Sequence, residues 1–256
     1  MIISAIKRPL WFMVLIAFSI IAVLCYFTKT TGAYAIYYNG SVRKLPIYKV
    51  DRQDNKIAIS FDCAWGADYT EKLLDILDEY NVKCTFFCVE FWVEKYPDMV
   101  QKIHKRGHDI GTHSKTHPNM SKLSKKQIEE ELTSSVKAIE NVISKKVELF
   151  RPPFGDYNDN LLEVANSLNL FTIQWSVDSL DWKDLTTKEI VNRVVSRTNK
   201  GDIILCHNNG ANTAKALPYV LSNLKEKGYE FVKISELIYK ENYKINSFGV
   251  QIKNDC

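Results

Sequence analysis

Two histidines spaced four residues apart, His113 and His117, are the first candidates in this sequence for binding a metal ion. On a helix this spacing would place both imidazoles on one face. Pro118 follows directly and disfavours a long helix, so a loop or a single turn must bring the rings together. Two surface histidines in a lysine-rich loop are the alternative. A catalytic metal site needs a third protein ligand, usually a carboxylate, and an open position for water.

A histidine and a carboxylate recur farther along the chain. His207 follows the apolar run Ile203–Cys206, and Asp181 with Trp182 precedes Thr186. Asp181 and Trp182 could simply cap the loop before Thr186. Alternatively, Asp181 orients a histidine and Trp182 provides an aromatic wall for a sugar ring. Paired with a carboxylate, His207 becomes a candidate general acid, because the negative neighbour raises its pKa towards neutral pH.

An aspartate and an arginine complete the set of candidate residues. Asp62 ends an alternating run that begins at Ile57, and Arg151 opens the proline-rich turn Arg151–Gly155. Arg151 could be an ordinary solvent-facing arginine. Its functional interpretation is a fixed, always-charged fork that holds a carboxylate in place.

Predicted strands precede each of these residues. A period of two indicates a strand at 57–62, a period of 3.6 indicates a helix over Tyr69–Tyr80, and capping boxes begin helices after Ser124 and Thr186. Further strands are expected at Cys84–Val89, His108–Gly111, Phe171–Val177, Ile203–Cys206 and Phe231–Ile234, with a helix over Ala214–Lys227.

This alternation of strands and helices predicts an α/β fold with a parallel sheet, and the number of units suits a barrel better than an open sheet. In such folds the catalytic residues lie at the carboxyl ends of the strands. Five polar clusters fall at such positions, namely those that contain Asp62, His113 with His117, Arg151, Asp181 and His207. An open doubly wound sheet is the alternative. No G-x-G-x-x-G follows any predicted strand, which argues against a dinucleotide site.

The composition limits the remaining classes of protein. The chain has 256 residues, a net charge of +4 and 25% charged residues, which excludes a mostly disordered chain and argues against a nucleic-acid partner. Its length allows one large domain or at most two small ones. Six cysteines in a chain of this length are too few for a disulfide scaffold.

The amino terminus carries an apolar run. Leu10–Phe27 has no charge over 18 residues, and Lys7 and Arg8 precede it, which predicts a membrane helix with its amino terminus inside and the rest exported. A signal peptide cleaved after Ala35 is the alternative and would give a secreted protein. We therefore expect an anchor or signal segment at 1–30, a stalk at 31–55, a catalytic domain at 56–240 and a tail at 241–256.

In this order and spacing, the five clusters that contain Asp62, His113 with His117, Arg151, Asp181 and His207 resemble the polysaccharide deacetylase family (carbohydrate esterase family 4, the NodB-homology domain) over Lys56–Ile238. The segment Ser60–Gly66, the anchor and the stalk are most similar to the sporulation-associated branch that acts on peptidoglycan. The resemblance implies a distorted (β/α) barrel of about seven parallel strands. It also implies an exported hydrolase that removes N-acetyl groups from amino sugars of cell-wall glycan and releases acetate.

The resemblance also implies a role for each candidate residue. Asp62 is the general base and Arg151 orients it, while Asp181 tunes His207, the general acid. His113 and His117 are ligands of a divalent metal ion, which we expect to be zinc. The residues expected to bind the substrate are Trp65, Phe154, Trp182 and Leu205.

One position departs from the family pattern, in which a second aspartate follows the first and is the third metal ligand. Here that position is Cys63. As a thiolate, Cys63 would give a Cys-His-His site that favours zinc. As a small apolar residue, it would leave a weak two-histidine site or a displaced ligand such as Asp68. The third alternative is a metal-free site that is slow or inactive.

Three other functions are alternatives to deacetylation. A glycan-binding protein would need the tryptophans but not the combination of Asp62, Arg151 and His207. A cytosolic amidase for small cyclic amides could share the barrel, but the export segment argues against it. A glycosidase needs two opposed carboxylates in place of a metal and a histidine.

Overall fold

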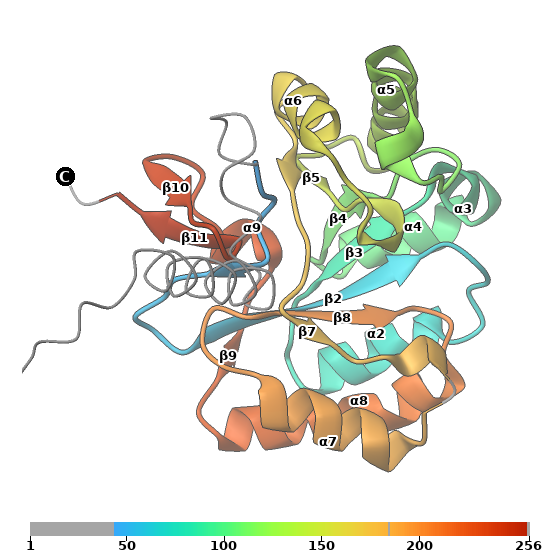
Figure 1. The fold of residues 1–256 in the computed structure, drawn as a ribbon. Coiled ribbons are helices and arrows are strands. Elements are labelled where there is room, and N and C mark those ends of the chain that lie inside the picture. Colours follow the sequence, from blue (N-terminus) through green and yellow to red (C-terminus); the bar gives the residue numbers. More distant parts are fainter. Residues whose placement is uncertain (1–43, 184, 255–256) are drawn as a thin grey trace, which may run out of the picture. The chain divides into compact units, whose positions relative to one another are not determined.

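The computed structural model describes residues 44–183 and 185–254. Its centre is a curved parallel sheet flanked by helices (Figure 1). The strands of this sheet are β2 (Lys56–Cys63), β3 (Thr85–Cys88), β4 (Asp109–Thr112), β5 (Leu149–Phe150), β6 (Phe171–Thr172), β7 (Val177–Asp178), β8 (Ile203–His207) and β9 (Glu230–Phe231). Seven of them pair in the order β6-β5-β4-β3-β2-β8-β7, and β9 pairs with the first residues of β2.

The path of the chain shows why this sheet curves. β6 and β7 lie at opposite ends of the strand order, yet only residues 173–176 separate them. So short a segment spans less than about 20 Å, so the two edges of the sheet must approach each other. The result is an incomplete barrel of seven parallel strands, which confirms the predicted α/β class. The single strand expected over Phe171–Val177 is wrong, because its two ends belong to opposite edges.

Helices cover the convex side of the sheet. They are α2 (Thr70–Glu79), α3 (Glu90–Lys95), α4 (Pro97–Lys105), α5 (Lys125–Ile143), α6 (Asp159–Ser167), α7 (Thr187–Arg197) and α8 (Ala211–Glu226). The short α9 (Ile234–Leu237) instead buries Ile234 and Leu237 in a smaller apolar core on the inner side of the sheet. α7 and α8 lie side by side (Figure 1). Both predicted capping boxes are present, at Ser124 and at Thr186. The strand expected over Phe231–Ile234 ends at Phe231, and Ile234 instead begins α9.

Alternate residues of β2 face two separate apolar cores. Ile59, Phe61 and Cys63 lie in the larger core, between the sheet and the helices. Ala58 lies in a smaller core inside the curve of the sheet, together with Phe87 of β3. Because successive side chains of a strand point to opposite faces, Asp62 lies on the inner face, between two residues of the outer face.

The structure differs from the expected domain limits at both ends. Ile47 bridges to Ile173, and β1 (Lys49–Val50) pairs with β11 (Val250–Lys253), which pairs with β10 (Tyr243–Ile245). Ile47 and Val50 are buried. Residues 44–55 therefore pack across the gap in the barrel and do not form part of a stalk. Residues 241–254 hold two strands and are not a tail.

The predicted anchor Leu10–Phe27, and the rest of the segment before Lys44, lie outside the described residues. Among the residues that the structure does describe, no helix has the length and apolar character needed to cross a bilayer.

A glycine in β4 makes room for the inner core. A Cβ at Gly111 would lie 2.7 Å from the Phe87 ring and 2.8 Å from the Leu149 carbonyl oxygen. We therefore expect Gly111→Ala to lower the free energy of unfolding by about 1–3 kcal/mol, measured by urea denaturation. Thr133→Ala, on the exposed face of α5, is the control and should change it by less than about 0.5 kcal/mol. Equal stability of the two variants would contradict this tight packing.

Candidate active site

The candidate residues gather at the carboxyl ends of the parallel strands, as the sequence predicts. Asp62 lies near the end of β2 and His207 ends β8, and the two are register partners on neighbouring strands. His113 follows β4 and Arg151 follows β5, while Asp181 comes soon after β7. Residues up to 145 positions apart in the chain therefore meet at one edge of the sheet.

A buried ion pair forms the first half of the site. Arg151 Nη1 donates to Asp62 Oδ1 at 2.8 Å, and Arg151 Nη2 donates to the Gln174 carbonyl at 3.2 Å. The guanidinium lies 4.2 Å from the centre of the Phe87 ring and is fully buried. A solvent-facing role for Arg151 is therefore wrong, because one nitrogen of its guanidinium binds the Asp62 carboxylate. Its role in a reaction stays a prediction.

This pairing decides the charge of Asp62. Burial alone would raise the pKa of the Asp62 carboxyl, but the charge and hydrogen bond of Arg151, together with the charge of His207, outweigh it and hold the pKa below its usual range. The carboxylate is thus ionised at neutral pH and able to accept a proton. It is 6% exposed, so it meets solvent only from the mouth of the barrel.

The second half of the site is a histidine bound to a carboxylate. His207 Nδ1 donates to Asp181 Oδ1 at 2.7 Å, while Asp181 Oδ2 accepts from the His207 backbone N–H at 2.8 Å and from the Thr213 hydroxyl at 2.7 Å. Burial lowers the pKa of His207, but the hydrogen bond and charge of Asp181 more than compensate and raise it above its usual value. The protonated imidazole is therefore stabilised. Asp181 binds His207 and does more than cap a loop.

His113 and His117 come together through a turn, not along a helix. Their ring centres lie 4.9 Å apart, and His117 has a positive φ of 58° that turns the chain after Ser114. His113 Nδ1 donates to the Arg151 carbonyl at 2.7 Å, which leaves Nε2 unprotonated in the neutral ring. Burial lowers the pKa of both rings, that of His117 to about 4, so both are neutral near pH 7.

Cys63 does not join the two histidines. It lies on the outer face of β2 and is fully buried in the larger core. Burial, together with the neighbouring Cys88 thiol, raises the pKa of Cys63 well above its usual value, so it is not a thiolate. Asp68, the other suggested ligand, is exposed. The expectation of Cys63 as a metal ligand is therefore wrong in this conformation, because strand alternation turns its side chain away from the site.

The residues of the site do not fit a catalytic zinc ion held by three protein ligands. Among the residues that the structure describes, no three His, Cys, Asp or Glu side chains are arranged to hold a metal ion. Two histidines converge, and Asp62 Oδ2 lies 3.5 Å from His113 Nε2. The groups available for chemistry at this site are therefore the side chains of this chain.

Exposed aromatic rings surround the mouth of the site. Trp65 and Phe154 lie 4.9 Å and 4.5 Å from His117, measured between ring centres, and each is about two-thirds exposed. Trp182 follows Asp181 and is 60% exposed. Leu205 lies two residues before His207, on the same face of β8, and is buried. These four residues were predicted to bind substrate, and the three exposed rings offer flat apolar faces to a sugar.

Three supporting residues were not found from the sequence. Gln174 accepts a hydrogen bond from Arg151 and donates to the Gly155 carbonyl, and Thr213 donates to Asp181. Asn208 is buried and donates to the Gly66 carbonyl and to the Thr70 hydroxyl. For Asn208, the pair of asparagines that follows His207 is a local signal in the sequence. Gln174 and Thr213 lie in segments whose patterns predicted only secondary structure.

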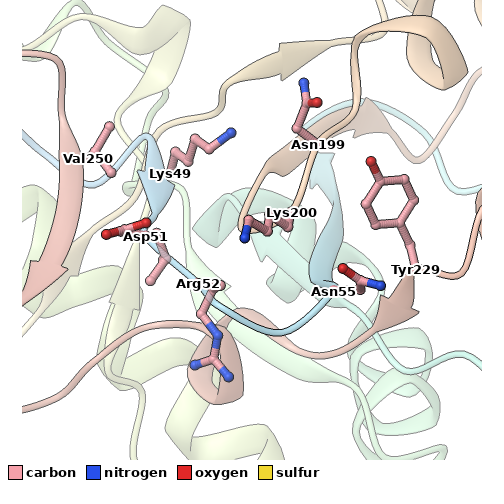
Figure 2. A pocket seen from close by; sticks show the side chains of 9 residues that line it. Lys49, Asp51, Arg52, Asn55, Asn199, Lys200, Tyr229 and Val250 are labelled. Atoms are coloured by element: carbon pink, nitrogen blue, oxygen red, sulfur yellow. The ribbon is translucent and has the colours of Figure 1, made fainter.

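A separate cavity of about 520 Å³ lies at the opposite, amino-terminal end of the strands (Figure 2). None of the predicted site residues lines it. Its Lys49 pairs with Asp202 at 2.7 Å, and its Arg52 Nε donates to Asp54 at 2.9 Å. Because these two cations already have partners, we do not assign the cavity to the chemistry of this site.

The incomplete barrel, the two buried carboxylate pairs at its carboxyl end and the aromatic mouth define a hydrolase site of the type that acts on carbohydrate. The family model for polysaccharide deacetylases matches residues 49–173. A peptidoglycan-N-acetylglucosamine deacetylase of Bacillus cereus is 36% identical over 75% of this chain and 92% of its own length. The chain belongs to the polysaccharide deacetylase family.

Two other similar proteins are an uncharacterized protein and a pseudoenzyme. The uncharacterized protein YlxY of Bacillus subtilis is 36% identical over 77% of this chain, which spans 62% of YlxY. The crystal structure of BA3943, a CE4 family pseudoenzyme from Bacillus anthracis, matches with a TM-score of 0.73 and 34% identity over 75% of this chain and 68% of that one. The family therefore includes both enzymes and proteins described as inactive.

The orientation of Cys63 gives a direct test with zinc. We expect His113→Ala and His117→Ala each to lower the affinity for Zn²⁺ at least about 10-fold, while Cys63→Ala leaves it unchanged. Equilibrium dialysis of the purified chain, with the metal measured by mass spectrometry, checks this. If Cys63→Ala weakens zinc binding as much as His117→Ala, the thiol is a ligand and our assignment of its orientation is wrong.

Proposed function

We propose that this chain removes N-acetyl groups from amino sugars of peptidoglycan and releases acetate. The observation that carries this proposal is the pairing of two opposed acid–base groups on neighbouring strands. Asp62, held ionised by Arg151, and His207, held protonated by Asp181, are register partners of β2 and β8. Amide hydrolysis needs both a base and an acid, because one proton leaves the water and another reaches the nitrogen.

Asp62 is proposed to begin the reaction as the general base. Its carboxylate takes a proton from a water molecule as the oxygen attacks the acetamide carbonyl carbon. Arg151 occupies Oδ1, so Oδ2, which faces His113 at 3.5 Å, remains available to the water. Arg151 also keeps the carboxylate in one orientation, since the guanidinium is fixed by the Gln174 carbonyl and the Phe87 ring.

His207 is proposed to complete the reaction as the general acid. Its Nδ1 is bound to Asp181, so Nε2 carries the proton that can be given away. Transfer of this proton to the amide nitrogen lets it leave as a neutral amine while the carbonyl carbon becomes acetate. Without the acid, the leaving group would be a far more basic amide anion.

The proposed substrate fits the mouth of the site. Trp65, Phe154 and Trp182 expose their rings around the acid–base pair. Flat rings of this kind bury the apolar faces of sugars, while the polar groups lie deeper. A cell-wall glycan is therefore the proposed partner, in agreement with the name of the Bacillus cereus relative.

A divalent metal ion enters this proposal only because the chain belongs to the polysaccharide deacetylase family. Such an ion would polarise the carbonyl and activate the water. His113 and His117 are the side chains that would meet it, whereas Cys63 faces the core.

The second candidate function is a weakened deacetylase that binds wall glycan. One specific observation favours it: the position after Asp62 holds a buried thiol instead of a ligand. The similarity to a CE4 family pseudoenzyme is consistent with it. This candidate predicts glycan binding without release of acetate.

We further propose that the chain is held at the cell membrane with its catalytic domain outside. The support is the uncharged run Leu10–Phe27 preceded by Lys7 and Arg8. We also propose that the chain belongs to the sporulation-associated branch of the family. The amino-acid sequence of the segment Ser60–Gly66 supports this. Both concern where the enzyme acts and leave its chemistry unchanged.

Asp62→Asn separates the two candidate functions. The amide keeps the shape of the carboxylate but cannot take a proton, so we expect acetate release from peptidoglycan to fall at least about 100-fold while glycan binding persists. Acetate is measured enzymatically, and mass spectrometry of muropeptides locates the modified sugar. Asp98→Asn, at an exposed position of α4, is the matched control and should keep full activity. Binding without acetate release by the wild-type chain would select the second candidate.

The two shifted pKa values predict a bell-shaped dependence of kcat/KM on pH. Activity should rise as Asp62 ionises and fall as pH passes the raised pKa of His207, above which the acid is lost. Asp181→Asn removes the charge that raises this pKa, so the alkaline limb should move to lower pH. Thr213→Val keeps that charge and should move it less. NMR titration of His207 in both variants provides the second measurement, and an unmoved limb in Asp181→Asn would mean that another group is the acid.

A further inference from the structure

Two buried cysteines lie opposite each other beside the active site. Cys63 of β2 and Cys88 of β3 are register partners in the last pair of the β2–β3 ladder. Both are fully buried in the larger core, and neither takes part in the proposed deacetylation. All four cysteines that the structure describes are free thiols, so this pair is in its reduced form.

The geometry of neighbouring strands suits a bond between these two side chains. In-register residues of adjacent strands have side chains on the same face, and the strands lie about 4.8 Å apart. This separation falls within the range of about 4.4–6.8 Å found between the Cα atoms of disulfides. The Cys63 thiol donates to the Phe61 carbonyl at 3.9 Å, and Cys88 contributes to the raised pKa of Cys63.

The other two cysteines do not share this arrangement. Cys84 lies in the same core as Cys88, but it precedes β3 and is four residues, or about 13 Å of extended chain, away from Cys88. Its Sγ lies 3.5 Å from His108 Nδ1. Cys206 is the register partner of Phe61, two residues before Cys63. Only the pair Cys63–Cys88 is therefore directly opposed in the described sheet.

We propose that Cys63 and Cys88 are a redox pair that closes to an interstrand disulfide when the folding chain meets an oxidising disulfide. One thiolate attacks the oxidant and releases its first thiol, and the second cysteine then displaces the remaining half as a second thiol. The protein loses two electrons and two protons, and the oxidant gains them. Because both thiols are buried in the folded state, the exchange takes place during folding, before the helices cover the strands.

The bond would join two strands that carry the site. Cys63 follows Asp62 directly, and its carbonyl accepts a hydrogen bond from Val89 at 3.0 Å. The Cys88 carbonyl accepts from the His113 backbone N–H at 2.9 Å. A disulfide here would fix the spacing between the strand of Asp62 and the start of the histidine turn. It would also bar Cys63 from binding a metal ion. The inference does not depend on the proposed deacetylase activity.

Refolding of the full chain in detergent tests the pair. The chain is unfolded under reducing conditions and refolded in a mixture of oxidised and reduced glutathione, and in a reducing agent alone. Free thiols are alkylated and the tryptic peptides are mapped. We expect the oxidised sample to contain the peptides Ile57–Lys72 and Cys84–Lys95 joined by a disulfide. Its Tm should be about 5–10 °C above that of the reduced sample.

Matched variants identify the sulfur atoms involved. Cys84→Ala changes the same tryptic peptide as Cys88→Ala, but we expect it to keep the link and the rise in Tm, whereas Cys88→Ala loses both. Full alkylation of Cys63 and Cys88 in the wild-type chain at every glutathione ratio overturns the proposal. A link from Cys63 to Cys84 or to Cys206 overturns it as well. Fragmentation of the linked wild-type peptides shows which cysteine of Cys84–Lys95 is alkylated, so both results are obtained from the wild-type chain even if a variant fails to fold.

Discussion

The ion pair between Asp62 and Arg151 is the interaction on which the site depends. A guanidinium with no exposed surface is costly to bury, and it is tolerated because the Asp62 carboxylate, the Gln174 carbonyl and the Phe87 ring surround it. These partners come from different strands and from the loop that crosses the gap of the barrel. The pair therefore fixes the relative positions of β2, β3, β5 and that loop, and the absent side chain of Gly111 leaves room for the ring.

On β2, the alternation of side chains places the catalytic residue on one face of the sheet and the core residues on the other. Asp62 faces the inside of the barrel, and its neighbours Phe61 and Cys63 belong to the helix-covered core. The same alternation on β8 places His207 inside and Cys206 outside. A shift of one residue in either strand would exchange the catalytic groups for apolar ones. The larger core thus holds the register that brings the acid opposite the base.

Sequence patterns predicted the strands that are long or buried on both faces, and the polar residues at their ends. β2 and β8 carry enough periodic residues to be recognised, and the capping boxes at Ser124 and Thr186 are local signals. β1 has two residues, too few to show a period, so the segment 44–55 was predicted to be part of a stalk. β6 also has two residues, and it was predicted to form a single strand with β7. The role of Thr213 depends on a contact across 32 positions, which no local pattern contains.

The two carboxylate oxygens of Asp62 face different neighbours. His113 Nδ1 carries the ring proton, so its unprotonated Nε2 faces Asp62 Oδ2 at 3.5 Å, and two electron-rich atoms approach without a proton between them. Arg151 holds the carboxylate from the other side, at 2.8 Å from Oδ1. The arginine therefore both orients the base and supplies the positive charge that keeps it ionised.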